Sequence, residues 1–160
     1  MCKLRPIAAV LILVCCGCGA EDVSTDTGPG TDPAAIQAWL VGDGFAEWDA
    51  ESDVFATSDF GAARSYFNAD LARSKQAGQR AHPVGSTAVR EFYAADGQTL
   101  RGYAYLTRVT DEAGASAWFF FETYDLSPDG SPQVAAAGAA NCAGCHQAAP
   151  DFVQTPWPLR

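Results

Sequence analysis

The residues with the clearest chemical potential form the segment CAGCH at positions 142–146. Its two thiols, Cys142 and Cys145, stand three residues apart, so one turn of the chain presents both together. Thiols at this spacing can form thioether bonds to the two vinyl groups of a haem, and the histidine that follows, His146, then lies under the iron as its proximal ligand. The segment therefore predicts one covalently attached haem c, bound by Cys142, Cys145 and His146.

Other uses of these side chains require partners that the sequence does not offer in an obvious place. A dithiol redox pair is expected in a thioredoxin-like βαβ context, and a structural zinc ion needs four ligands, for which only His82 could join the three. A disulfide across three residues would leave His146 without a role. The remaining four of the six cysteines fall within the first 18 residues, so they cannot form a disulfide framework for the fold.

The sixth position of the iron decides what such a haem can do. Met1 is the only methionine and falls in an expected signal peptide, which excludes the His/Met pair of many electron carriers. The only other histidine is His82, directly before Pro83. As a distal ligand it would give a bis-histidine electron-transfer haem, whereas as a turn histidine it would leave the iron open. We expect an open or water-bound iron, which small-ligand binding or catalysis requires.

The N-terminal 17 residues have the pattern of a bacterial lipoprotein signal. Lys3 and Arg5 precede an apolar run at 7–14 that is too short to span a bilayer, and small residues and cysteines follow. We expect lipidation at Cys18, with Cys16 as the alternative, and an ordinary cleaved signal as the other interpretation. Covalent haem attachment takes place outside the cytoplasm, so the haem motif and the signal both predict an exported protein. We expect it to be anchored to a membrane by lipid and to face the periplasm.

The rest of the chain predicts one domain behind a linker. Residues 18–32 are polar, rich in Gly and Pro, and lack periodicity, which predicts a flexible tether. The domain, at 33–160, should start with a helix that Asp32 caps and Pro33 opens. A hydrophobic fraction of 48% can supply a core, and the formal net charge of −9 argues against nucleic acid as a partner while leaving a basic redox protein open.

Strand signals dominate the centre of this domain. Three segments rich in aromatic and β-branched residues are separated by Asp-Gly turns, which predicts an antiparallel meander. The expected strands are 63–68, 86–94, 99–109 and 116–124, and the expected helices are 34–41, 69–76 and the alanine-rich 133–146, which carries the haem motif at its C-terminal end. The fold class is therefore α+β, mainly an antiparallel β-meander with a few short helices.

Both faces of the expected sheet carry large apolar side chains, so a haem on one face and a helix on the other would cover them. Glu91 and Glu122 interrupt apolar strands, where a carboxylate could relay protons at the haem or form a salt bridge with Arg90 or Arg101. Arg90 is a further catalytic candidate. The candidates for the distal pocket are Phe92, Tyr103, Trp118, Phe119 and Phe121, and those for holding a haem propionate are Arg64, Arg90 and Arg101.

The C-terminal block CAGCHQAAPDFV, at 142–153, resembles that of the cytochrome P-460 family, which includes cytochrome c′-beta. The segments 66–68, 82–91 and 117–119 are also similar, so the resemblance covers roughly residues 35–155. It implies a predominantly antiparallel β fold, often dimeric, with His146 as proximal ligand. Cytochrome P-460 proteins oxidise hydroxylamine and handle nitric oxide with a haem cross-linked to a lysine; cytochrome c′-beta lacks the cross-link and binds small gases.

The sequence departs from the cross-linked pattern at its lysines. Lys3 lies in the expected signal and Lys75 in a polar stretch, and the strand position where the family often has Lys-Glu reads Arg90-Glu91. An arginine stays protonated and is a poor nucleophile for such a bond. We therefore expect a haem without the cross-link that binds or, as an oxidoreductase, transforms nitric oxide, hydroxylamine or peroxide.

Overall fold

The structure is a computed structural model that describes residues 26–58 and 61–160. The expected signal peptide, the lipidation candidates Cys18 and Cys16, and most of the expected tether lie outside the described residues. Within the described part, no helix is long and apolar enough to cross a membrane.

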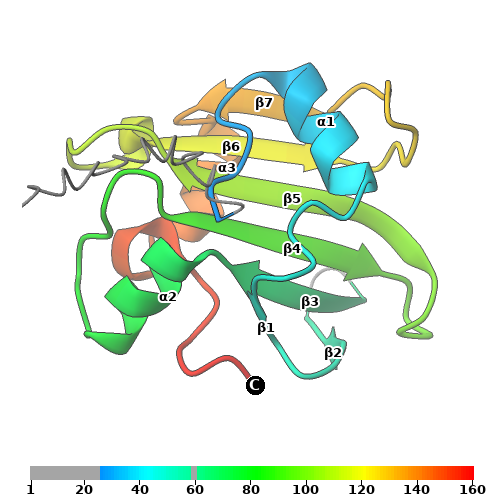
Figure 1. The fold of residues 1–160 in the computed structure, drawn as a ribbon, viewed down its shortest axis with the longest axis horizontal. Coiled ribbons are helices and arrows are strands. Elements are labelled where there is room, and N and C mark those ends of the chain that lie inside the picture. Colours follow the sequence, from blue (N-terminus) through cyan, green and yellow to red (C-terminus); the bar gives the residue numbers. More distant parts are fainter. Residues whose placement is uncertain (1–25, 59–60) are drawn as a thin grey trace, which may run out of the picture.

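An antiparallel sheet of seven strands forms the centre of the part that the structure describes (Figure 1). The strand order is β1-β3-β4-β5-β6-β7, and β2 also pairs with β3, so β3 to β6 form a meander in chain order. The strands are β1 (Asp49–Ala50), β2 (Phe55–Ala56), β3 (Ala62–Phe67), β4 (Thr87–Tyr93), β5 (Leu100–Arg108), β6 (Trp118–Thr123) and β7 (Val134–Ala137). The helices are α1 (Pro33–Val41), α2 (Ala69–Gln76) and α3 (Ala140–His146), with short 3-10 turns at Ala115–Ala117 and Pro150–Phe152. The expected α+β class and its four strands are confirmed.

The first two helices begin where side chains cap them. The Asp32 carboxylate accepts hydrogen bonds from the backbone nitrogens of Ala34 and Ala35, each at 2.9 Å, and Pro33 opens α1. The Asn68 side-chain oxygen accepts from the backbone nitrogen of Leu71 at 3.1 Å and starts α2. These caps satisfy backbone donors that have no partner inside the helix, which fixes both helix starts at the expected positions.

The composition of the alanine-rich segment 133–146 predicts one helix, and this prediction is wrong. Its first part is β7, which pairs antiparallel with β6, and only Ala140–His146 is helical. Gly138, with φ +62°, separates the two. The strand forms because β6 would otherwise present unpaired backbone groups at the sheet edge, and pairing outweighs the local helix preference of alanine.

The described end of the expected tether is held against the domain. The Asp26 carboxylate accepts from the backbone nitrogen of Ala69 at 2.8 Å, and its carbonyl accepts from the Asn68 amide at 3.2 Å. The Tyr105 hydroxyl donates to the carbonyl of Gly30 at 3.0 Å. Residues 26–32 are therefore part of the folded domain and not a free linker. The sequence pattern could not reveal this, because the partners of these residues lie far away along the chain.

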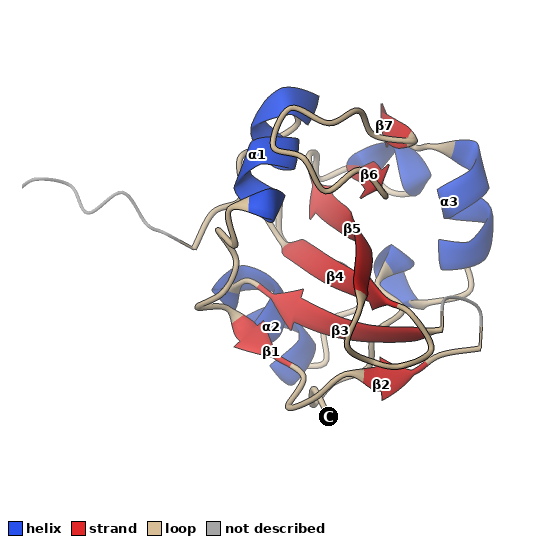
Figure 2. Cartoon of the chain, turned by 90° about the vertical axis from the view of Figure 1, so that its right-hand side faces the viewer, coloured by secondary structure: helices blue, strands red, loops and turns tan. Residues whose placement is uncertain are grey.

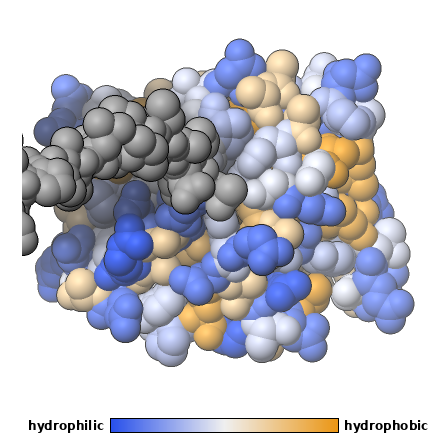
Figure 3. Space-filling model, in the orientation of Figure 1, coloured by the Kyte–Doolittle hydropathy of each residue, from blue (hydrophilic) through white to orange (hydrophobic). Residues whose placement is uncertain are grey.

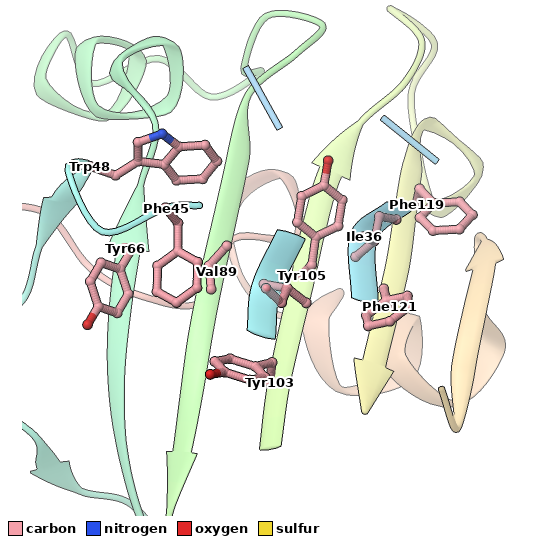
Figure 4. Close-up of a cluster of buried hydrophobic side chains, with 10 residues drawn as sticks. Ile36, Phe45, Trp48, Tyr66, Val89, Tyr103, Tyr105, Phe119 and Phe121 are labelled. Carbon is pink, nitrogen blue, oxygen red and sulfur yellow. The ribbon is translucent and has the colours of Figure 1, made fainter. Parts of the chain in front are cut away.

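The two sheet faces are covered differently. Figure 2 shows α1 and α3 on opposite sides of the sheet. On the α1 side, buried aromatic and aliphatic side chains form one cluster (Figure 4) of Ile36, Leu40, Phe45, Trp48, Tyr66, Val89, Tyr103, Tyr105, Phe119 and Phe121. On the α3 side, a second cluster includes Phe67, Leu71, Trp118, Phe120 and Val153. The outer surface seen in Figure 3 mixes hydrophilic residues with separate hydrophobic patches.

Candidate haem-binding site

A pocket lies on the sheet face opposite α1, between the middle strands, α3 and the C-terminal segment. Its cavity volume is about 90 Å³, and it opens in part to solvent. Its lining comes from β4, β5 and β6, from His146 at the end of α3, and from Val153, Gln154 and Thr155; the strand side chains are Ala88, Arg90, Phe92, Ala104, Leu106 and Glu122. Apolar side chains with a few polar groups among them are the usual lining of small-molecule and cofactor sites.

The floor of the pocket is open at its centre because small side chains lie there. Ala104 pairs with Arg90 on one side and with Glu122 on the other, and Ala88 pairs with Leu106. Side chains at these positions point to the same face, since directly opposite residues of an antiparallel pair share a face. A flat apolar group can therefore approach the sheet between Arg90 and Glu122.

His146 is held in one orientation at the wall of this pocket. Its Nδ1 lies 2.7 Å from the carbonyl oxygen of Phe152. Because a carbonyl only accepts, Nδ1 carries the proton, and the lone pair stands on Nε2. The ring also meets the Phe120 ring edge-on, with centroids 5.5 Å apart. A metal-bound histidine in proteins commonly donates its second nitrogen to a carbonyl in this way.

The charge state of His146 suits a metal ligand. Burial lowers its pKa below the usual 6.5 of a histidine, and the nearby Arg90 lowers it further, whereas the Phe152 carbonyl and Glu122 act in the opposite direction. Because burial is the largest cause, the pKa lies below 6.5 and the imidazole is neutral at pH 7. Only a neutral imidazole can coordinate a metal ion.

The two candidate thioether cysteines are free thiols on α3. Cys142 is half-buried against the second cluster and Cys145 is exposed. Burial, followed by the charge of Glu122 and by Cys145, raises the pKa of the Cys142 thiol. A dithiol redox motif needs a lowered thiol pKa, so this environment does not favour that use. Within residues 26–58 and 61–160, no group of three or more His, Cys, Asp or Glu side chains could hold a metal ion.

Of the three arginines expected near a propionate, the pocket contains Arg90. Arg64 donates from Nε to the Glu51 carbonyl at 2.8 Å, and its guanidinium lies over the Tyr66 ring of the opposite face. Arg101 is exposed and lines a separate hollow near Tyr93. Arg90 therefore remains as the candidate cation for this site, and Glu122 as the candidate carboxylate.

Glu91 is not brought to the pocket. It lies on the opposite sheet face, where its carboxylate accepts hydrogen bonds from the hydroxyls of Tyr66 at 2.8 Å and Tyr93 at 2.9 Å. Burial and these hydrogen bonds raise the pKa of both tyrosines. Because strand side chains alternate, the single step from Arg90 to Glu91 places the two on different faces. Glu91 cannot relay protons in the pocket and serves the core instead.

The expected distal aromatics divide between the two faces. Tyr103, Phe119 and Phe121 pack in the α1-side cluster, as Figure 4 shows, so they do not line the pocket. Phe92 lines the pocket and stacks with Tyr124. Trp118 is on the pocket side but fully buried behind it. Sequence alternation could separate the two sets but could not tell which set α1 would cover.

His82 is buried outside the pocket. Its Nδ1 lies 2.8 Å from the Ser74 hydroxyl, which itself donates to the Gln79 side chain at 2.7 Å, so Nδ1 is the protonated nitrogen. Burial lowers its pKa from 6.5. Nε2 has no hydrogen-bond partner, and the residue does not line the cavity that His146 lines. This placement does not support His82 as the sixth ligand.

Sequence reasoning did not anticipate the wall formed by Val153, Gln154 and Thr155. Lys75 holds this segment by donating from Nζ to the carbonyls of Val153 at 3.2 Å and Thr155 at 2.7 Å. Burial lowers the lysine pKa. The lysine is thus engaged by the backbone, which gives it a structural role in this conformation.

Comparison of the sequence with protein-family models and with curated proteins finds no match.

Proposed function

We propose that this protein is a mono-haem c-type cytochrome of the cytochrome P-460 type, which binds or transforms a small ligand at a histidine-ligated haem. The candidate ligands are nitric oxide, hydroxylamine and peroxide. One observation carries the proposal: His146, at the end of the CAGCH helix, lines an apolar pocket and has its Nδ1 engaged by the Phe152 carbonyl. That arrangement leaves Nε2 as the nitrogen that can bind iron.

The pocket side chains suit a haem in charge and in polarity. The haem, when bound, supplies an iron whose sixth position can take a small ligand. Arg90 offers a cation for a propionate, and the apolar side chains of Ala88, Ala104 and Leu106 exclude water from the sheet side. Glu122 is the carboxylate that could give or take a proton in this pocket.

Two features favour an open iron over an electron carrier. His82 is absent from the pocket lining, and Met1 is the only methionine of the chain. An open site suits gas binding or haem oxidoreductase chemistry better than outer-sphere electron transfer. The alternative, a bis-histidine cytochrome with His82 as sixth ligand, would require His82 to leave its contact with Ser74.

The proposal includes a location and partners. Export, a lipid on Cys18 or Cys16, and a periplasm-facing domain would supply the compartment in which haem is attached. A basic redox protein would be the electron partner, and a homodimer follows from the family resemblance. Neither nucleic acid nor a membrane-spanning segment is part of this proposal.

The test is to produce the full chain together with a c-type haem-attachment system and to measure its intact mass and its visible spectrum. We expect one covalent haem, lost in Cys142→Ala/Cys145→Ala, and a ferrous spectrum that changes when nitric oxide is added. His82→Ala is the matched control for His146→Ala: it should keep the spectrum, whereas His146→Ala should change it.

A wild-type chain without covalent haem would refute the proposal. A low-spin ferrous spectrum that ignores nitric oxide and is lost in His82→Ala would establish the bis-histidine alternative instead.

A further inference from the structure

Two consecutive residues after the candidate haem helix have a left-handed backbone. Asp151 has φ +46° and Phe152 has φ +63°, although neither is glycine. L-residues rarely adopt this region, so the surrounding structure must hold the turn in place. The turn has a clear structural product: it places the Phe152 carbonyl oxygen 2.7 Å from Nδ1 of His146.

The carboxylate of Asp151 fixes this turn through three donors from separate parts of the chain. Oδ2 accepts from the backbone nitrogen of His82 at 2.7 Å and pairs with Nη1 of Arg108. Oδ1 accepts from the indole nitrogen of Trp118 at 3.3 Å. The side chain of Asp151 is only 10% exposed and that of Arg108 5%, so solvent screens the ion pair little.

The donors are themselves held firmly. Arg108 also donates to the carbonyls of Thr110 at 3.0 Å and Glu112 at 2.9 Å, which fixes its guanidinium at the end of β5. Trp118 has no exposed surface at the start of β6. The end of the sheet thus sets the position of the Asp151 carboxylate, and the carboxylate sets the turn.

We propose that Asp151 is a positioning residue for the haem ligand. Through the turn it holds the Phe152 carbonyl on the Nδ1 proton of His146, and so determines the tautomer, orientation and basicity of the imidazole. This inference rests on the proposed haem function for its chemical meaning. A firm hydrogen bond at Nδ1 makes the ligand more basic and favours ferric over ferrous iron.

The experiment compares Asp151→Asn and Asp151→Ala with wild type in the haem-loaded protein. The control is Asp70→Asn, which removes the carboxylate of an exposed pair with Arg73. We expect both Asp151 variants to keep covalent haem but to shift the ferric/ferrous equilibrium toward ferrous iron, about tenfold in Asp151→Ala, or about 59 mV for one electron. The iron–histidine stretching frequency in the resonance Raman spectrum should fall in parallel, and Asp70→Asn should change neither.

A gentler variant and a haem-free measurement keep the inference testable on their own. Trp118→Phe keeps a smaller aromatic ring and removes the indole donor, so it should shift both signals in the same direction by less. In the haem-free full chain, ¹⁵N NMR should find His146 protonated at Nδ1 in wild type and a mixture of tautomers in Asp151→Asn.

An Asp151 or Trp118 variant that folds but keeps the wild-type tautomer and potential would overturn the inference. If wild type carries no covalent haem, the proposed function fails, and the NMR comparison still decides whether Asp151 positions His146.

Discussion

The pocket floor allows a substitution that separates haem binding from folding. Ala104→Leu places three further carbon atoms in the space between Arg90 and Glu122, on the face where β5 carries small side chains. In the haem-free chain this space is unfilled, so the larger side chain should find room there. In the haem-loaded protein the same space would be needed for the cofactor.

The expected effect on the haem-free chain is a gain in stability. Burying three methylene-sized groups at about 0.8 kcal/mol each contributes up to about 2.4 kcal/mol. Ordering a leucine side chain costs about 0.5–1 kcal/mol of this. The free energy of unfolding of the haem-free chain should therefore rise by about 1–2 kcal/mol, while the yield of covalent haem should fall severalfold.

The assay is urea unfolding of the haem-free chain beside haem quantification after attachment. Ala135→Leu is the matched control, since Ala135 lies half-buried on β7 against the α1-side cluster. It should leave haem yield unchanged. If Ala104→Leu and Ala135→Leu both attach haem at the wild-type level, haem does not bind over Ala104 in this pocket, and the prediction is wrong.

Three further outcomes follow from the structure. Arg108→Ala should destabilise the protein by about 3–5 kcal/mol in urea unfolding, because it leaves Asp151 buried without its charge partner. Arg73→Ala, which breaks an exposed pair, should cost no more than about 1 kcal/mol, and equal losses in the two variants would contradict this prediction. Gly102→Ala should cost about 1–3 kcal/mol in the same assay, because the added Cβ would press on the Thr123 carbonyl and come 2.8 Å from Cδ1 of Tyr124. Gly144→Ala has open space around the added Cβ and should be neutral or stabilising by up to about 1 kcal/mol. Burial lowers the pKa of His82 below 6.5, so the unfolded chain takes up a proton first, and the stability of the haem-free chain should fall as pH decreases from 6.5 to the folded-state pKa. His82→Asn should flatten that slope in unfolding measured across this pH range, and an unchanged slope would show that His82 does not contribute to it.

Residue patterns along the chain were sufficient to predict the strands and helices that depend on neighbouring residues. The strands β4 to β6 follow from aromatic and β-branched runs separated by turns, and α1 and α2 start at their capping residues Asp32 and Asn68. The strand β7 was not predictable in this way, because its alanines favour helix and only the open edge of β6 makes them a strand. The CAGCH segment identified three candidate ligands from spacing alone, and the structure places Cys142, Cys145 and His146 together on α3.

The faces of the sheet mark the limit of what alternation reveals. Arg90 and Glu122 share the pocket with His146, whereas Glu91 joins Tyr66 and Tyr93 on the other side. Alternation places neighbours on opposite faces but does not say which face a helix will cover. The sequence did carry a signal for the pocket face, because the small residues Ala88, Gly102 and Ala104 fall on one side of β4 and β5, where a core-forming face would carry larger side chains.

That asymmetry links the stability of the domain to its proposed cofactor. The α1 side buries ten large or medium side chains, whereas the centre of the other side leaves apolar surface beside an open space. Every 100 Å² of such surface that a flat apolar group covers contributes about 2.5 kcal/mol. A haem lying on Ala88 and Ala104 would therefore complete the second core as well as provide an iron. Under the proposed function, the small residues of β4 and β5 would form the binding surface, and replacing them with larger side chains would raise the stability of the haem-free chain while lowering haem binding.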